Sequence, residues 1–168
     1  MKPIATIASH GPLLAACIVA APPGGVLELG AGAYSTALIH YLARVAGRAV
    51  RTIDSDAAWI ARFAGLQSPG HDLTVDADPV SSPVLALPWA VAFVDGKHGE
   101  RAGCLRALHH VPLVVVHDTE PERLDKYPGV GVELAKYAYR LDLRMPMMER
   151  NQTSVVSDLC EPRVLLKL

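Results

Sequence analysis

Short apolar runs alternate with helix-patterned segments along this 168-residue chain, and the alternation limits its fold more than any other feature. Five runs have the composition of buried strands: 26–29, 50–53, 73–75, 90–94 and 113–116. Three segments between them have helical spacing: 35–46, 56–66 and 100–110. Strands that alternate with helices indicate a parallel sheet joined by right-handed crossovers. We therefore expect a single doubly wound α/β domain over residues 1–168.

The N-terminal residues 1–25 precede this alternation, and we expect a helical lead-in there. The apolar run Leu13–Ala21 follows a single lysine, which is unlike a secretory signal. It is also shorter than the ~20 residues that span a bilayer. We therefore expect a buried helix and a cytoplasmic protein.

The C-terminal part has a weaker pattern. Residues 120–150 are partly helical but interrupted by proline and glycine, and we expect an insertion on the substrate side. Thr153–Ser157 and Arg163–Leu168 are predicted to be two final strands, paired antiparallel at the sheet edge. Within the helix predicted at 35–46, Leu38, Leu42 and Val45 fall on one face.

Composition argues against several classes of function. The formal net charge is −1, so the chain has no uniform basic field for nucleic acid, although a local basic patch stays open, and an aromatic content of 5% leaves little material for a base-stacking surface. Cys17, Cys104 and Cys160 are widely spaced, which fits a reducing compartment rather than a disulfide framework. We expect no nucleic-acid partner and no membrane partner.

Polar residues follow the predicted strands at the edge where open parallel sheets bind ligands. The first strand leads into Gly30 and Gly32, which permit a tight turn and a close approach of backbone to ligand. Asp54 follows the second strand at the offset of an acid that binds a ribose diol. Asp95 and Asp118 follow the fourth and fifth strands. The sequence therefore predicts a ligand that contains a nucleoside.

Glu28 favours one such ligand over another. The dinucleotide pattern G-x-G-x-x-G requires a third glycine at position 35, where this chain has Ser35. A carboxylate two residues before Gly30 would repel a pyrophosphate but attract the ammonium and sulfonium groups of S-adenosylmethionine (SAM). We therefore expect SAM rather than NAD.

The order of four stretches resembles that of class I SAM-dependent methyltransferases: Val26–Thr36, Thr52–Trp59, Phe93–His98 and Val116–Thr119. Within that superfamily, the VDG after the fourth strand and the HD after the fifth are similar to the small-molecule O-methyltransferase branch, which includes macrocin O-methyltransferase-like enzymes. The resemblance covers about residues 26–121. It implies a Rossmann-like, mostly parallel sheet.

The resemblance also implies roles for individual residues. It places Glu28, Gly30 and Gly32 around the methionine moiety of SAM, Asp54 at the ribose and Asp76 beside the adenine. The full set of implied cofactor contacts is Glu28, Gly30, Ala31, Gly32, Tyr34, Ser35, Asp54, Ser55, Asp76, Ala77 and Asp95.

At the reacting end we expect Asp95, His98 and Asp118 to be catalytic. Relatives that bind a metal carry acids at positions matching Asp95, His117 and Asp118. Two carboxylates and an imidazole could hold Mg²⁺ or Mn²⁺. Structural roles stay open as well: His98 as a partly buried imidazole bonded to backbone, and His117 as a group that only orients Asp118.

The expected reaction is methyl transfer from SAM to an oxygen of a small-molecule acceptor. No substrate-capping domain is evident, so we expect a homo-oligomer. Three alternatives stay open: a methyltransferase acting on nitrogen or on a macromolecule, a SAM-binding module without turnover, and an NAD-linked reductase. No Asn/Asp-Pro-Pro-Tyr/Phe motif follows the fourth strand, which disfavours methylation of nucleic-acid bases.

Overall fold

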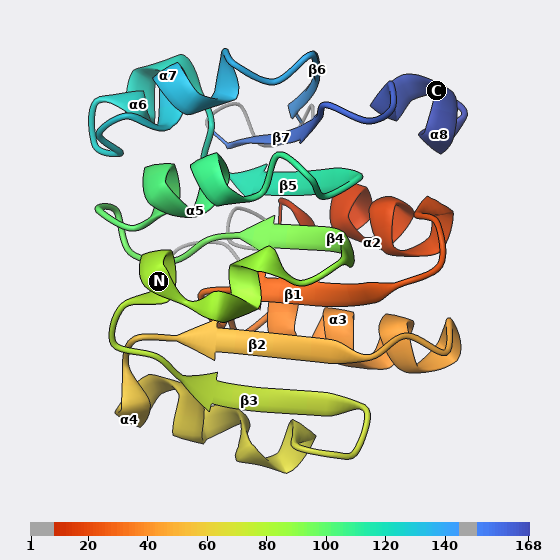
Figure 1. Cartoon of the computed structure of the whole chain (residues 1–168), viewed down its shortest axis with the longest axis vertical. Coiled ribbons are helices and arrows are strands. Elements are labelled where there is room, and N and C mark those ends of the chain that lie inside the picture. The colour runs from red at the N-terminus through yellow and green to blue at the C-terminus, as the bar shows by residue number, and fades with distance from the viewer. Residues whose placement is uncertain (1–8, 145–150) are drawn as a thin grey trace.

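The computed structural model describes residues 9–144 and 151–168, so residues 1–8 of the predicted lead-in and 145–150 of the predicted insertion lie outside it. In the described ranges, seven strands form one sheet in the order β3-β2-β1-β4-β5-β7-β6 (Figure 1). They are β1 (Gly25–Leu29), β2 (Val50–Asp54), β3 (His71–Val75), β4 (Trp89–Val94), β5 (Leu113–His117), β6 (Tyr139–Arg144) and β7 (Gln152–Ser157). Strands β1 to β5 pair in parallel, and β7 runs antiparallel to both β5 and β6. The doubly wound, mostly parallel α/β fold with an antiparallel edge is confirmed.

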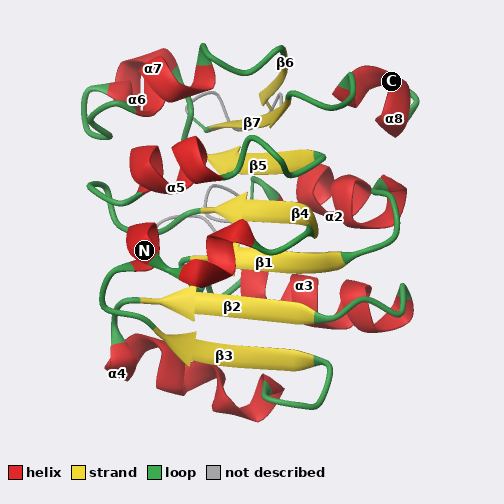
Figure 2. Ribbon diagram, viewed as in Figure 1, coloured by secondary structure: helices red, strands yellow, loops and turns green. Residues whose placement is uncertain are grey.

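Helices cover both faces of the sheet (Figure 2). One face carries α2 (Gly11–Ala20), α3 (Ser35–Val45) and α8 (Pro162–Leu166); the other carries α5 (Arg101–Ala107), α7 (Val130–Leu134) and the 3₁₀ turns η2 (Pro79–Ser81) and η3 (Pro83–Ala86). Shorter helices follow β2 and β5: α4 (Ala57–Ile60) with the 3₁₀ helix η1 (Ala61–Leu66), and α6 (Pro121–Leu124). Across the described residues, none of these helices combines the length and the apolar character needed to cross a membrane.

The core consists of two apolar layers, because successive side chains of a strand point to opposite faces. Leu27 and Leu29 of β1 pack in the layer beneath α5 and α7. Val26 of β1 and Phe93 of β4 pack in the layer beneath α2 and α3. Strand β5 is buried along its whole length, which explains its continuous apolar sequence.

One detail of the predicted fold is wrong. Arg163–Leu168 is not a strand, because Pro162–Leu166 forms α8, with the proline in the first turn where its missing N–H costs no helical hydrogen bond. The antiparallel partner of β7 is instead β6. In α3, Ile39 and Ala43 are fully buried, Leu38 and Leu42 are partly buried against the same layer, and Val45 is 85% exposed at the C-terminal end of the helix.

The strand order reverses at β1, and there the chain leaving β1 packs against the chain leaving β4. The Gly30 amide donates to the carbonyl of Ile53 (2.8 Å), and the Asp95 amide donates to the carbonyl of Leu29 (2.9 Å). Gly30 has φ of +95°, and a Cβ added to it would lie 2.5 Å from the backbone nitrogen of Gly96. Glycine is required at position 30 by both conformation and space. The ends of β1, β2 and β4 therefore meet closely at one edge.

Replacing Gly30 by alanine is expected to lower the free energy of unfolding by about 2–4 kcal/mol, because the backbone of Gly96 cannot move away without disturbing β4. Gly32→Ala is the matched control: its Cβ would meet the Ser35 hydroxyl, which can rotate, so the expected loss is below about 1 kcal/mol. Urea denaturation followed by circular dichroism measures both values. Equal losses would contradict the close packing at Gly30.

Candidate functional site

A cavity of about 700 Å³ opens at the carboxyl ends of β1, β2, β4 and β5. Its size lies in the range of small-molecule and cofactor sites. The predicted site residues that line it are Gly30, Ala31, Asp54, Ser55, Asp95, His98 and Asp118. The strand ends named by the sequence thus surround one cavity.

Ala31 is the central residue of the turn after β1, and it is held from two sides. Its amide donates to Asp54 Oδ2 (2.8 Å), while its carbonyl accepts from Trp59 Nε1 (2.6 Å). The other carboxylate oxygen of Asp54 accepts the Asp56 amide (2.8 Å). Asp56, in turn, caps α4 by accepting the amide of Trp59 (3.0 Å). Asp54 therefore links the ends of β1 and β2 and leaves the helix cap to Asp56.

Glu28 does not line this cavity and lies in a buried polar chain beneath α3. The Thr52 hydroxyl donates to Glu28 Oε2 (2.7 Å) and lies 2.8 Å from His71 Nε2. His71 Nδ1 lies 3.0 Å from His40 Nδ1 on α3. Burial raises the pKa of Glu28 to about 7, although nearby hydroxyl groups oppose the shift, and burial together with His40 lowers the pKa of His71 to about 4. The contact between Glu28 and SAM stays a prediction.

Five other implied cofactor residues also lie outside the cavity lining: Gly32, Tyr34, Ser35, Asp76 and Ala77. Gly32 donates its amide to the Thr36 hydroxyl (2.9 Å) at the start of α3. Asp76 accepts the amide of Asp78 (3.1 Å) in the loop after β3. For these residues cofactor contact stays a prediction.

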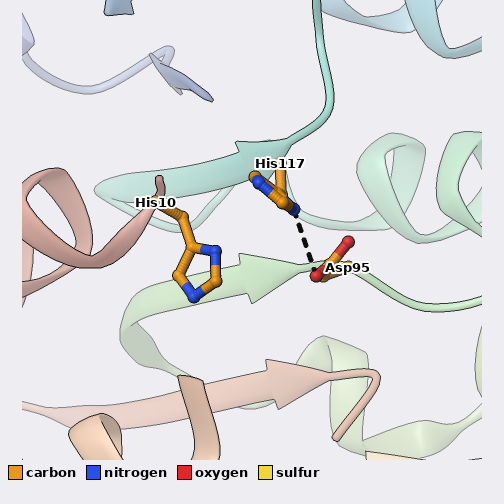
Figure 3. A group of neighbouring side chains, drawn as sticks. All are labelled: His10, Asp95 and His117. Atoms are coloured by element: carbon orange, nitrogen blue, oxygen red, sulfur yellow. Dashed lines mark ion pairs between the residues drawn. The ribbon is translucent and has the colours of Figure 1, made fainter. Parts of the chain in front are cut away.

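Asp95 lines the cavity and is paired on both carboxylate oxygens. One carboxylate oxygen accepts from the buried guanidinium of Arg101, and the other lies 3.3 Å from His117 Nδ1 (Figure 3). Burial alone would raise the pKa of Asp95, but His117 and Arg101 outweigh it and hold that pKa below its ordinary value. Arg101 also donates to the carbonyls of Gly96 (2.8 Å) and His117 (2.9 Å). It therefore joins the ends of β4 and β5.

Asp118 has an unusual backbone and a fixed side chain. Its φ is +56°, in the left-handed region that non-glycine residues seldom occupy. Its carboxylate accepts from Arg123 (2.9 Å) and from the Tyr127 hydroxyl (2.9 Å). His117 Nε2 is 3.8 Å away. Such strain is often found at functional sites, and here α6 and the following turn supply the groups that hold it.

His10 was not expected in the site. It precedes α2, is 3% exposed, and its ring centroid lies 4.7 Å from that of His117 and 4.9 Å from that of Phe93. Neither ring nitrogen has a hydrogen-bond partner among the described residues. Ser9 lies beside it, with its hydroxyl 3.0 Å from His117 Nε2. The sequence offers little indication of this position, because a histidine before an apolar run is ordinarily interpreted only as the boundary of the helix.

Comparisons with known proteins support the fold. No protein-family model matches the chain, and no curated protein sequence matches it either. Among solved structures, the C-terminal domain of precorrin-6Y C5,15-methyltransferase from Rhodobacter capsulatus is 18% identical, with a TM-score of 0.58 over 86% of this chain and 88% of that chain. A proposed O-methyltransferase from Klebsiella pneumoniae is 20% identical, with a TM-score of 0.64 over 89% and 80%. The chain has the Rossmann-like fold of these methyltransferases.

The fold is not restricted to proteins named as methyltransferases. Spermidine synthase from Thermotoga maritima is 12% identical, with a TM-score of 0.64 over 94% of this chain. This chain spans 61% of that synthase. At these identities the likeness establishes the fold, so the reaction has to be argued from the cavity.

The pKa of Glu28 predicts a pH-dependent difference in stability between the natural chain and Glu28→Gln. Between pH ~4.5 and ~7 the folded carboxyl keeps a proton that the unfolded one has lost. The natural chain should therefore lose about 3 kcal/mol relative to the variant across this range, with no further change above pH ~7. Urea denaturation at a series of pH values measures the difference. Two parallel profiles would show that Glu28 ionises as freely as in the unfolded chain.

Proposed function

We propose that the chain is a SAM-dependent methyltransferase that methylates an oxygen of a small molecule. The observation that carries the proposal is the convergence of the glycine turn, Asp54, Asp95 and His98 on one cavity at the strand-order reversal. The methyltransferases among the structural neighbours support the reaction class. The cavity volume suits a cofactor together with a small acceptor.

The residues on the β1–β2 side fit an adenosyl cofactor. Asp54 is 9% exposed and lines the cavity, and its carboxylate can accept ribose hydroxyls in addition to its two backbone amides. The backbone at Gly30 has no side chain, so a ligand can approach it closely. Trp59 supports this wall through its bond to Ala31. When bound, SAM supplies a methyl group on a positively charged sulfur.

His98 is the proton acceptor in this proposal. Asp95 and Asp118 also line the cavity, but each carboxylate is paired with an arginine. His98 is exposed, and its ring packs edge-on against Tyr127, with 4.6 Å between centroids. As the acceptor oxygen gains the methyl group, its hydroxyl proton passes to the His98 imidazole, which becomes an imidazolium. Asp95 and Asp118 do not take the proton in this proposal; each holds its arginine in place.

A SAM-binding module without turnover is the rival function. The observation that favours it is the neutralisation of both Asp95 and Asp118 by arginines, Arg101 and Arg123. The two functions agree on cofactor binding but differ on what His98 does. Homo-oligomer formation stays a prediction.

Calorimetric titration with SAM, S-adenosylhomocysteine and NADH tests the cofactor. Asp54→Asn should weaken binding of the two SAM-type ligands at least about 10-fold, because a carboxylate partner of the ribose is lost. Asp72→Asn is the control, because Asp72 pairs with Arg51 and does not line the cavity, and it should change affinity less than about 3-fold. Binding of NADH alone, or SAM binding unaffected by Asp54→Asn, would contradict the proposal.

Release of S-adenosylhomocysteine in a screen of hydroxyl-containing small molecules tests turnover. His98→Ala should lower kcat about 100-fold and leave the SAM affinity within about 3-fold, because the proton acceptor is lost but the cofactor wall is intact. His110→Ala is the control, since His110 bonds the Leu87 carbonyl and does not line the cavity. Unchanged kcat in His98→Ala would exclude His98 as the base.

A further inference from the structure

The magnesium site implied by the resemblance does not fit the side chains. Mg²⁺ prefers six oxygen ligands in octahedral geometry. The carboxylate of Asp118 is already engaged by Arg123 and Tyr127, and one oxygen of Asp95 is engaged by Arg101. The three implied residues therefore leave one carboxylate oxygen that neither an arginine nor a tyrosine engages, Asp95 Oδ2, which lies beside the imidazole of His117. This donor set is poor for Mg²⁺.

A different group of donors meets at the same strand ends. His10, Asp95 and His117 come from the segment before α2, from the end of β4 and from the end of β5 (Figure 3). One ligand atom from each lies within 4.8 Å of the other two. Two imidazoles and a carboxylate suit zinc and other divalent transition ions better than magnesium.

The orientation of His117 supports metal binding through its Nδ1 atom. Its Nε2 atom lies 3.0 Å from the Ser9 hydroxyl, which accepts a hydrogen bond in the tautomer that carries the proton on Nε2. Without an ion, Nδ1 is paired with Asp95 Oδ2, 3.3 Å away, and a bound ion would replace the proton between these two atoms. Ligand atoms of a tetrahedral zinc site are about 3.4 Å apart, since each bond is about 2.0–2.1 Å long. His117 and Asp95 already have this spacing.

His10 supplies the second, independent observation. The residue is 3% exposed, and its two buried ring nitrogens have no hydrogen-bond partner in the part of the chain that the structure describes. A buried imidazole without partners is unfavourable unless a ligand satisfies it. An apolar residue would fill the space beside Phe93 without this cost. The position of His10 next to His117 and Asp95 points to an ion as the missing partner.

We propose that His10, Asp95 and His117 bind one divalent transition-metal ion, with Zn²⁺ and Co²⁺ preferred over Mg²⁺. Arg101 leaves Asp95 Oδ2 free for the ion by holding Oδ1. Because Asp95 lines the cavity, a bound ion would lie beside the acceptor and lower the pKa of its hydroxyl group. This role rests on the proposed methyl transfer, whereas the binding itself does not.

The test uses the full chain, freed of metal by a chelator and studied without SAM. Titration with Zn²⁺, Co²⁺ and Mg²⁺ in separate calorimetric experiments measures affinity and stoichiometry, and the visible absorption of Co²⁺ reports on its ligands. We expect one Zn²⁺ or Co²⁺ per chain and at least about 100-fold weaker binding of Mg²⁺. No binding of Zn²⁺ and Co²⁺, or equal affinity for Mg²⁺, would overturn the proposal.

Two variants separate this site from the arrangement implied by the resemblance. His10→Phe keeps a ring against Phe93 but removes the donor, and should weaken Zn²⁺ binding at least about 10-fold and change the Co²⁺ absorption. Asp118→Asn should leave Zn²⁺ affinity within about 3-fold. The opposite pattern would reject His10 as a ligand. His10→Ala, checked by circular dichroism, replaces His10→Phe if the latter does not fold.

A negative metal result leaves the proposed methyltransferase intact, because SAM affinity is measured separately and without added metal. Conversely, metal binding without SAM binding would preserve the ion site and remove the methyltransferase. In the first case His117 and Asp95 form a simple ion pair, and His10 is a packing residue.

Discussion

The contact between Gly30 and the Asp95–Gly96 backbone is the constraint on which the site depends. A side chain at position 30 would occupy the space of the peptide that follows β4, so the two strand ends approach only because none is present. The hydrogen bonds of Gly30 to Ile53 and of Asp95 to Leu29 then fix three strand ends relative to one another. The backbone contacts alone therefore bring Asp54, Asp95 and the glycine turn to one cavity, and no contact between their side chains is needed for this.

The sequence predicted the architecture well where burial dictates composition. The central parallel strands β1, β4 and β5 are short, largely apolar runs buried on both faces, and the turns between the strands carry glycine and proline. Prediction failed at the C-terminal edge, where Arg163–Leu168 is too short to show whether its apolar residues follow a strand or a helix. Pro162 was the available signal, since proline is common in the first turn of a helix. The strand β6 has three charged residues among six and therefore lacks a core-strand composition.

The site was predictable only in part, because strand ends are local in sequence whereas their partners are not. Asp54, Asp95, His98 and Asp118 each follow a strand, and the structure places all four at the cavity. Alternation of side chains points Glu28 to the sheet face beneath α3, outside the cavity lining, where its carboxyl bonds Thr52 in a buried polar chain. His10 and Arg101 reach the site from other elements, and no spacing rule connects them to β4 or β5. Their positions beside Asp95 and His117 become visible only once the helices pack on the sheet.

The left-handed backbone of Asp118 has a consequence for how this chain would respond to laboratory evolution. Aspartate, asparagine and glycine tolerate a φ of +56° far better than other residues, so few substitutions there keep the fold. Selection for folded protein would favour glycine, which relieves the strain but loses the contacts with Arg123 and Tyr127. Selection for turnover would favour retention of the carboxylate. In a library of variants at position 118, selection for folding and selection for activity should therefore favour different residues.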